Sequence, residues 1–214
     1  QTRLALVLTI YFLSVVAFSI MTTTFSLFMM FRLGYDPWHS GWIFAFVGVI
    51  SAAVQGGLIG KLVKRFGEPA LVVAGALLCS ASLFATPYVN PMIGLIGLLA
   101  IGAASSIGNA LMAPSLSSLA SKSATAGEQG GVLGVTQSVA SLARAVGPSI
   151  AAVLIYSAVA HMGFDRQSQN MSDASILRTF WTAATIQFSA FLLAAYFART
   201  YGKKYQAGEV AEVS

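Results

Sequence analysis

Charged residues and cysteines are scarce in this sequence. Asp, Glu, Lys and Arg make up 9% of the 214 residues, whereas soluble domains contain about 25%. The single cysteine, Cys79, has no partner for a disulfide within the chain, and thiolate metal sites are excluded as well. The two histidines, His39 and His161, stand alone, and zinc-protease, phosphate-loop and nucleophile-elbow motifs are missing. The sequence therefore predicts no enzyme, no metal site and no cofactor.

Hydrophobic residues are abundant instead. They make up 57% of the chain, and the mean hydropathy is +0.77, which predicts an integral membrane protein. The formal net charge is +5, from 12 Lys and Arg against 7 Asp and Glu. Membrane proteins commonly show such an excess because their cytoplasmic loops are basic, so a nucleic-acid partner is not needed to explain it.

Six apolar segments are long enough to cross the ~30 Å hydrocarbon layer, which takes about 20 helical residues. Turn-rich or charged sequences separate them. We expect an all-α bundle of six transmembrane helices over residues 1–205 and a disordered cytoplasmic tail over 206–214. The expected spans are 4–30, 41–63, 69–88, 91–113, 130–156 and 176–198, with a Ser/Ala-rich connection over 115–129.

The ends and the loop charges predict the topology. The chain opens at Gln1 rather than Met, and its first apolar run is too long for a signal-peptide core, so we expect a cut through a longer protein or a late start. Basic residues favour the side that holds both termini, which predicts cytoplasmic termini in a multi-pass protein of a cell membrane, such as a bacterial inner membrane. That side holds Arg3, Lys61, Lys64, Arg65, Lys122, Arg199, Lys203 and Lys204, against Arg32, Arg166 and Arg178 on the other.

Arg144 lies near the middle of the fifth span, where a cation costs at least a few kcal/mol. Gln137, Ser141, Arg144 and Pro148 follow at spacings of four, three and four, which places them on one helical stripe, while valines form another. Gly147-Pro148 interrupts the backbone hydrogen bonds, which is tolerable where neighbours or water satisfy the freed carbonyl. Two interpretations remain: a structural arginine paired with a carboxylate, or a substrate-site or gate residue, which we prefer.

Several other intramembrane residues are candidates for a cavity lining. Ser105, Asn109 and Met112 share a face of the fourth span, and a row of small residues on the second span is expected to let two helices approach closely. The alternatives are an interhelical hydrogen bond for the glutamines, backbone hydrogen bonds for the Ser and Thr hydroxyls, and packing or lipid contact for the Met and Phe side chains. The cavity-lining candidates are Ser105, Asn109, Met112, Gln55, Thr24 and Phe28, in addition to Gln137, Ser141 and Arg144. Gln187 is expected to form either an interhelical hydrogen bond or a ligand contact, and the small row consists of Ala52, Gly56 and Gly60.

The segment from Gly60 to Pro69, GKLVKRFGEP, resembles the loop motif G-x-L-a-D-r-x-G-r-r of major facilitator superfamily transporters. Gly60, Leu62, Arg65 and Gly67 match, whereas Lys64 replaces the aspartate and Glu68-Pro69 replace the basic pair. That departure is typical of the weaker copy in the second half of such proteins. We expect Arg65 to act as a conformational latch, and Gly67 to allow a turn with positive φ.

The fifth span resembles the antiporter motif G-x8-G-x3-G-P-x2-G-G of the same family. Gly134, Gly147 and Pro148 match, and alanines replace three of the glycines. Together the two motifs resemble spans seven to twelve of a twelve-span transporter, closest to the drug:proton antiporter branch of tetracycline and multidrug exporters. The resemblance implies alternating access between two six-helix halves around a central site. The first and fourth spans would line the cavity, and the second and fifth would face the other half.

The implied function is the export of a small amphipathic or hydrophobic molecule, with membrane lipid and an N-terminal six-helix half as partners. No Asp or Glu lies within an expected span, so the carboxylate for proton coupling is expected in the other half. Two alternatives stay open: an organic-anion or metabolite carrier in which Arg144 pairs with the substrate, and a transporter-like subunit that acts as a scaffold or assembly factor in a membrane complex.

Overall fold

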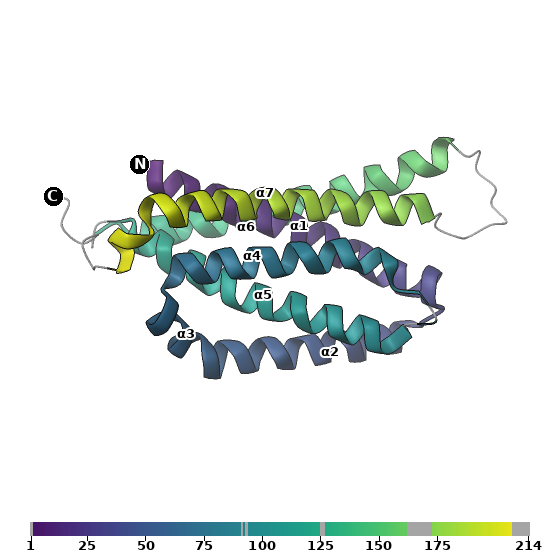
Figure 1. Cartoon of the computed structure of the whole chain (residues 1–214). Helices are drawn as coiled ribbons and strands as arrows, with labels where there is room; N and C mark the ends of the chain where they lie inside the picture. Colours follow the sequence, from purple (N-terminus) through teal and green to yellow (C-terminus); the bar gives the residue numbers. More distant parts are fainter. Residues whose placement is uncertain (1, 91, 93, 125–126, 162–172, 207–214) are drawn as a thin grey trace.

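The computed structural model describes residues 2–90, 92, 94–124, 127–161 and 173–206. Within them it confirms the predicted all-α architecture, because six helical segments are long and apolar enough to cross a membrane (Figure 1). The elements are α1 (Thr2–Leu33), α2 (Pro37–Ala53), the π-helical turn η1 (Val54–Leu58), α3 (Ile59–Phe66), α4 (Glu68–Ala85), the 3₁₀ turn η2 (Thr86–Tyr88), α5 (Gly94–Lys122), α6 (Gln129–His161) and α7 (Asp173–Gln206).

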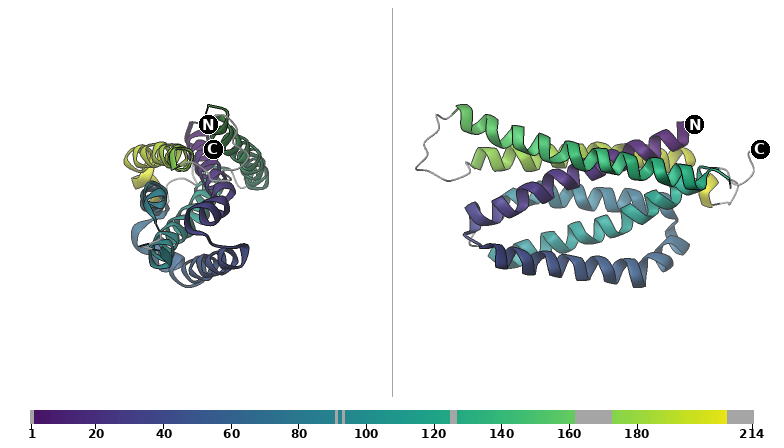
Figure 2. Two further views of the ribbon diagram at one scale, coloured as in Figure 1. Left: turned by 90° about the vertical axis from the view of Figure 1, so that its right-hand side faces the viewer. Right: turned by 180° about the vertical axis from the view of Figure 1, so that it is seen from behind.

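The described helices form an open arc in the order α6, α1, α7, α4, α5 and α2 (Figure 2). The largest contacts join α4 to α5 and α7, and α1 to α7 and α6, while α2 packs mainly on α5. The two ends of the arc are the least covered helices. Only 11% of the α2–α3 span and 22% of the α6 span are buried, against 56% of the α4 span.

Small residues allow the closest helix crossings. A Cβ on Gly75 would lie 2.4 Å from the carbonyl oxygen of Gly108, and a Cβ on Gly108 would lie 2.7 Å from Sγ of Cys79. The backbones of α4 and α5 are therefore in direct contact, as is common between membrane helices. Where α5 crosses α2, the Ser106 hydroxyl donates a 2.7 Å hydrogen bond to the carbonyl of Val47.

The fourth helix is longer than the sequence predicted. Residues 115–122, expected to begin a Ser/Ala-rich connection, continue α5 past Pro114. Leu116, Leu119 and Ala120 are almost fully buried there, so tertiary packing stabilises a segment whose serines and proline disfavour a helix. The expected disordered tail and most of the polar loop before the sixth span lie outside the described residues.

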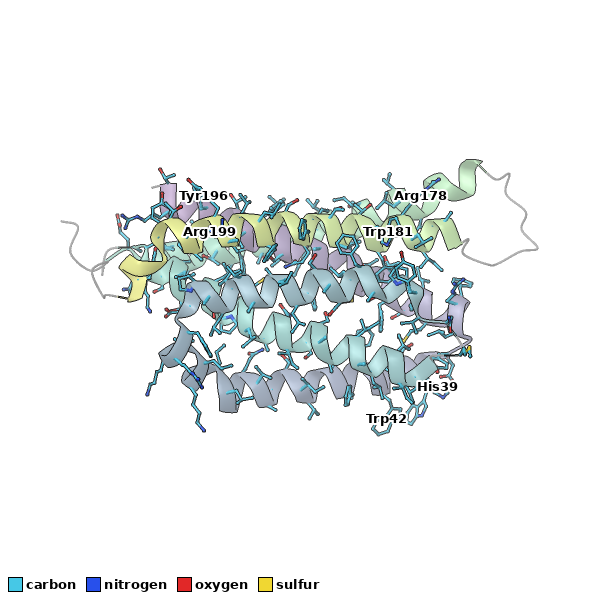
Figure 3. All side chains as sticks on the ribbon, in the orientation of Figure 1. His39, Trp42, Arg178, Trp181, Tyr196 and Arg199 are labelled. Carbon is cyan, nitrogen blue, oxygen red and sulfur yellow. The ribbon has the colours of Figure 1, made fainter. Side chains whose placement is uncertain are left out.

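Aromatic and charged side chains gather at the two ends of the bundle. Tyr196 and Arg199 lie near the end that holds both chain termini, and His39, Trp42, Arg178 and Trp181 lie near the other (Figure 3). Trp42 and Tyr196 are 63% and 56% exposed. Such amphipathic rings suit the level of the lipid headgroups, so the two belts bracket the apolar spans.

Candidate functional site

A small cavity lies among α1, α4, α5 and α7, and most of its lining residues come from α1 and α5. Its volume is about 10 Å³, roughly the space of one water molecule. All three of the polar-face residues predicted on the fourth span line it, so the predicted shared face is real. The lining consists of Ser14, Phe18, Met21, Cys79, Leu83, Ser105, Asn109, Met112 and Gln187.

The sulfur of Met112 is the polar centre of this cavity wall. The Ser14 hydroxyl approaches it to 3.4 Å from α1, and the Gln187 amide nitrogen approaches it to 3.6 Å from α7. Gln187 is only 2% exposed, and its contact is interhelical, as one of the two sequence interpretations held. Thioethers accept weak hydrogen bonds. The Met112 sulfur therefore links α5 to α1 and α7 without placing a charge in the membrane.

Sequence reasoning did not select Ser14, Phe18 and Met21 for the cavity. They follow one another at spacings of four and three on α1, which is the signal of a common helical face. Phe18 is 43% exposed, so its side chain lines the cavity and also reaches the surface of the bundle. The lining therefore combines Met and Phe side chains, which suit apolar groups, with Ser and Asn side chains, which can hydrogen-bond.

Two other candidates from the first span lie inside the bundle. Thr24 and Phe28 are both fully buried. The Thr24 hydroxyl donates to the carbonyl of Ile20 at 2.9 Å, and the Phe28 ring packs edge-on against Phe180 with 5.4 Å between centroids. In this conformation their surroundings are those of packing residues.

A third stripe of α6, which lies between the polar stripe and the valine stripe, makes the contact with the rest of the bundle. Its members are small and buried, and they pack towards α1: Thr136, Ala140, Ala143, Gly147 and Ala151. Gln137, Ser141 and Arg144 are exposed, and Pro148 is half-buried. Among the described residues Arg144 forms no ion pair. The predicted polar stripe thus lies beside the α1 contact, on the uncovered surface of the arc's end helix.

At the crossing of α1 and α6, Ser19 meets the Gly147-Pro148 break. A Cβ on Gly147 would lie 2.5 Å from Cβ of Ser19, so only glycine permits this approach. Proline has no N–H to bond the carbonyl four residues earlier, which is that of Arg144. The Ser19 hydroxyl donates to this carbonyl oxygen at 3.4 Å. Of the two donors that the sequence left open, a neighbour or water, the structure shows a hydroxyl of the neighbouring helix α1.

The small-residue row predicted on the second span does not contact another described helix. The row Ala52, Gly56 and Gly60 is exposed, and a Cβ on Gly56 or Gly60 would meet no described atom within 4 Å. The expected close helix approach is therefore not made within the described part of the chain. Gln55 is also exposed, and its amide donates to the Ser51 hydroxyl at 2.9 Å.

The loop motif forms the junction between α3 and α4. Gly67 has φ of 79°, which confirms the predicted positive-φ turn. Arg65 is exposed, and its guanidinium carbon lies 5.3 Å from the centroid of the Phe66 ring. Gly134 of the antiporter motif is exposed, with no described atom near enough to contact a Cβ.

Glu68 completes this junction and was treated as a loop residue in the sequence. It is 6% exposed in the first turn of α4 and forms an ion pair with Lys122 in the last turn of α5. Ser118 donates a second hydrogen bond to its Oε1 at 3.1 Å. An acidic residue directly before Pro at a helix start was the available signal, because carboxylates are favoured at helix N-termini.

Comparison with known proteins decides the family. The sequence profile described as Major Facilitator Superfamily matches residues 2–148. The chain belongs to the major facilitator superfamily. This superfamily consists of transporters rather than enzymes. The six long apolar helices of the chain make it a multi-pass membrane protein.

Three relatives of the superfamily carry the name "Major facilitator superfamily domain-containing protein 10". The Bos taurus protein is 34% identical over 144 residues, which cover 67% of this chain and 30% of the relative. The Homo sapiens protein is 32% identical over 157 residues, covering 72% of this chain and 33% of the relative. The chain thus spans about a third of the length of these relatives. No solved structure matches the chain.

Proposed function

We propose that the chain is one six-helix half of a secondary transporter that exports a small amphipathic or hydrophobic molecule by proton-coupled alternating access. The observation that carries this proposal is Arg144. It is exposed close to the middle of α6, an apolar helix at one end of an open arc. An arginine at mid-membrane depth needs a partner or water, which a surface covered only by lipid does not supply.

The proposed partner is a second six-helix half, which would cover the surfaces of α2 and α6. These two helices are the least buried of the described spans. Their uncovered surfaces carry the small row of α2 and the polar stripe of α6, and both features suit contact with other helices better than contact with lipid. The relatives, about three times as long as the matched region, leave room for such a half.

The proposed substrate class follows from the cavity lining between α1 and α5. Phe18, Met21 and Met112 offer apolar, adaptable contacts, and Ser105 and Asn109 offer hydrogen bonds. In the conformation described, the cavity holds little more than one water molecule. Substrate entry therefore requires α1 and α5 to move apart within this half, in addition to the rocking of the two halves against each other.

Export with proton coupling, which the resemblance to drug:proton antiporters implies, places the proton carrier outside this chain's spans. Arg144 is proposed as the partner of that carrier rather than as the carrier itself. We propose that it pairs in one access state with a carboxylate of the second half, and that proton binding to this carboxylate releases it. The pair would then couple proton binding to the rocking of the halves.

Transport into liposomes by the complete protein tests this function. Ethidium serves as the amphipathic cationic probe, with an imposed pH gradient as the driving force. We expect Arg144→Ala to lower the rate at least tenfold and Arg144→Lys to restore part of it, because lysine lacks the planar fork of donors. Arg199→Ala removes an exposed arginine near the bundle end and should leave the rate unchanged. Near-normal ethidium transport by Arg144→Ala would overturn the proposal.

One observation favours a second candidate, an organic-anion or metabolite carrier. No described carboxylate pairs with Arg144, so an anionic substrate could be its partner. The same liposomes loaded with fluorescein, an anionic dye, separate the two candidates. Fluorescein transport that needs Arg144 and ignores the pH gradient would favour the anion carrier. Purification in a fixed complex, with no flux of either dye, would favour a scaffold subunit.

A further inference from the structure

We propose that Ser19 is a positioning residue for Arg144: its hydroxyl replaces the backbone donor that Pro148 removes, and so fixes the direction in which the guanidinium leaves α6. This inference deepens the proposed function and rests on it where transport is concerned. It goes beyond the two sequence motifs, because Ser19 belongs to neither and lies on another helix.

The helix α6 lacks one backbone hydrogen bond at Arg144, because the ring of Pro148 replaces the N–H group. In a regular helix the N–H of residue 148 would donate to the carbonyl of residue 144, and proline supplies no such donor. An unsatisfied carbonyl in the hydrocarbon layer costs several kcal/mol. The carbonyl and the side chain belong to the same residue, so freedom at the carbonyl becomes freedom in the orientation of the guanidinium.

Ser19 is placed to remove that freedom. It is 7% exposed, its Oγ lies 3.4 Å from the Arg144 carbonyl oxygen, and it packs directly against Gly147. The contact depends on glycine, since a Cβ at 147 would lie 2.7 Å from this same Oγ. Gly147, Pro148 and Ser19 thus form one unit: glycine admits α1, proline frees the carbonyl, and serine binds it.

Near this crossing, the backbone of α1 accepts additional side-chain hydrogen bonds. The hydroxyls of Thr22 and Thr23 both donate to the carbonyl of Ser19, at 3.1 and 2.9 Å. Such hydrogen bonds back to the preceding turn bend helices slightly. The crossing therefore joins a turn of α1 that carries two additional hydrogen bonds to the proline break in α6, and the Ser19 hydroxyl links the two.

A double-mutant cycle tests the inference in the complete protein, reconstituted in lipid nanodiscs. The four forms are the natural protein, Ser19→Ala, Pro148→Ala and the double variant. Pro148→Ala restores the helical N–H donor, so Ser19→Ala should matter only when Pro148 is present. The matched control is Thr9→Ala, which removes a hydroxyl of α1 that bonds its own helix, at Ala5, at 2.8 Å.

The first readout is the rate at which phenylglyoxal modifies Arg144, followed by mass spectrometry of its peptide. Loss of one hydrogen bond corresponds to a change of about two- to tenfold. We expect Ser19→Ala to raise the Arg144 rate by that factor, to leave Arg199 unchanged, and to have no effect in the Pro148→Ala background. This readout needs no transport, so it stands even if the proposed function fails.

The second readout is the transport rate of the same four forms. Ser19→Ala should lower it about two- to tenfold, with Thr9→Ala unchanged and the loss absent in the Pro148→Ala background. Equal effects of Ser19→Ala in both backgrounds, by either readout, would overturn the proposal. A coupled change in Arg144 reactivity with unchanged transport would also overturn the positioning role, and leave Ser19 as a structural contact alone.

Discussion

The carboxylate of Glu68 in the first turn of α4 forms an ion pair with the ammonium group of Lys122 in the last turn of α5. The acid lies at a helix N-terminus and the base at a helix C-terminus, so each charge also interacts favourably with its own helix dipole. Glu68 has a nearly buried side chain, while that of Lys122 is 47% exposed. The pair ties the α3–α4 junction to the end of α5.

Lys122→Met should destabilise the protein more than Glu68→Gln. The lysine variant leaves a buried carboxylate with Ser118 as its remaining side-chain partner, whereas glutamine removes the charge and keeps a group that can accept a hydrogen bond. We expect a loss of about 1–3 kcal/mol for Lys122→Met, at the lower end of the range for buried pairs because the lysine is half exposed. Thermal unfolding in detergent micelles measures both. A larger loss for Glu68→Gln would contradict this account.

Asp36 should make the start of α2 sensitive to acid. Its carboxylate accepts a hydrogen bond from the backbone N–H of His39 at 2.9 Å and contacts Nδ1 of that residue at 2.6 Å. The hydrogen bonds from His39 lower the pKa of Asp36 below its usual value of 3.8. A lowered carboxyl pKa stabilises the folded state above pH 3.8, and this contribution is lost as the pH falls through the folded-state value.

Asp36→Ala should therefore lower the melting temperature at pH 7, and the difference from the natural protein should shrink as the pH falls below 3.8. Asp36→Asn is the matched control, because asparagine also caps helices but does not titrate. Melting curves between pH 3 and 7 measure the effect. A difference that grows as the pH falls would contradict the assigned sign.

Arg65→Ala should lower the transport rate with little change in substrate affinity. The residue is exposed at the α3–α4 junction and is not among the residues that line the cavity, and its described contact is with the neighbouring Phe66 ring. A residue that biases the equilibrium between access states changes turnover rather than the binding contacts. Lys61→Ala, which removes another exposed cation of α3, is the control. A large loss of affinity with normal turnover would instead place Arg65 in the substrate site.

The cytoplasmic location of both termini remains a prediction from the basic residues. His39 is exposed near the start of α2 (Figure 3), and Gly127 is exposed between α5 and α6. The α2–α3, α4 and α5 spans lie between them, so they are expected on opposite sides of the membrane. Cys79 is buried. In a Cys79→Ser background, His39→Cys should react with a membrane-impermeant maleimide in intact cells, and Gly127→Cys only after permeabilisation. The opposite pattern would invert the topology, and labelling of both in intact cells would refute the number of crossings between them.

The sequence alone determined the number of membrane-spanning helices, the positive φ of Gly67 and the need for a donor to the carbonyl freed by Pro148. These features depend on segment length, on the backbone freedom of glycine and on the missing N–H of proline, which are local properties of the chain. The shared face of Ser105, Asn109 and Met112 also followed, because helical periodicity fixes which residues of one helix lie together.

The tertiary structure decided which helical faces meet. It assigned Ser19 as the donor to Arg144, Lys122 as the partner of Glu68, and the Met112 sulfur as the acceptor shared by Ser14 and Gln187. It placed Thr24 and Phe28 in the core, left the Ala52–Gly56–Gly60 row uncovered, and extended α5 to Lys122. The spans of this chain are predominantly apolar, so the periodicity of apolar residues does not by itself mark the buried face. Packing of small residues and interhelical hydrogen bonds select it.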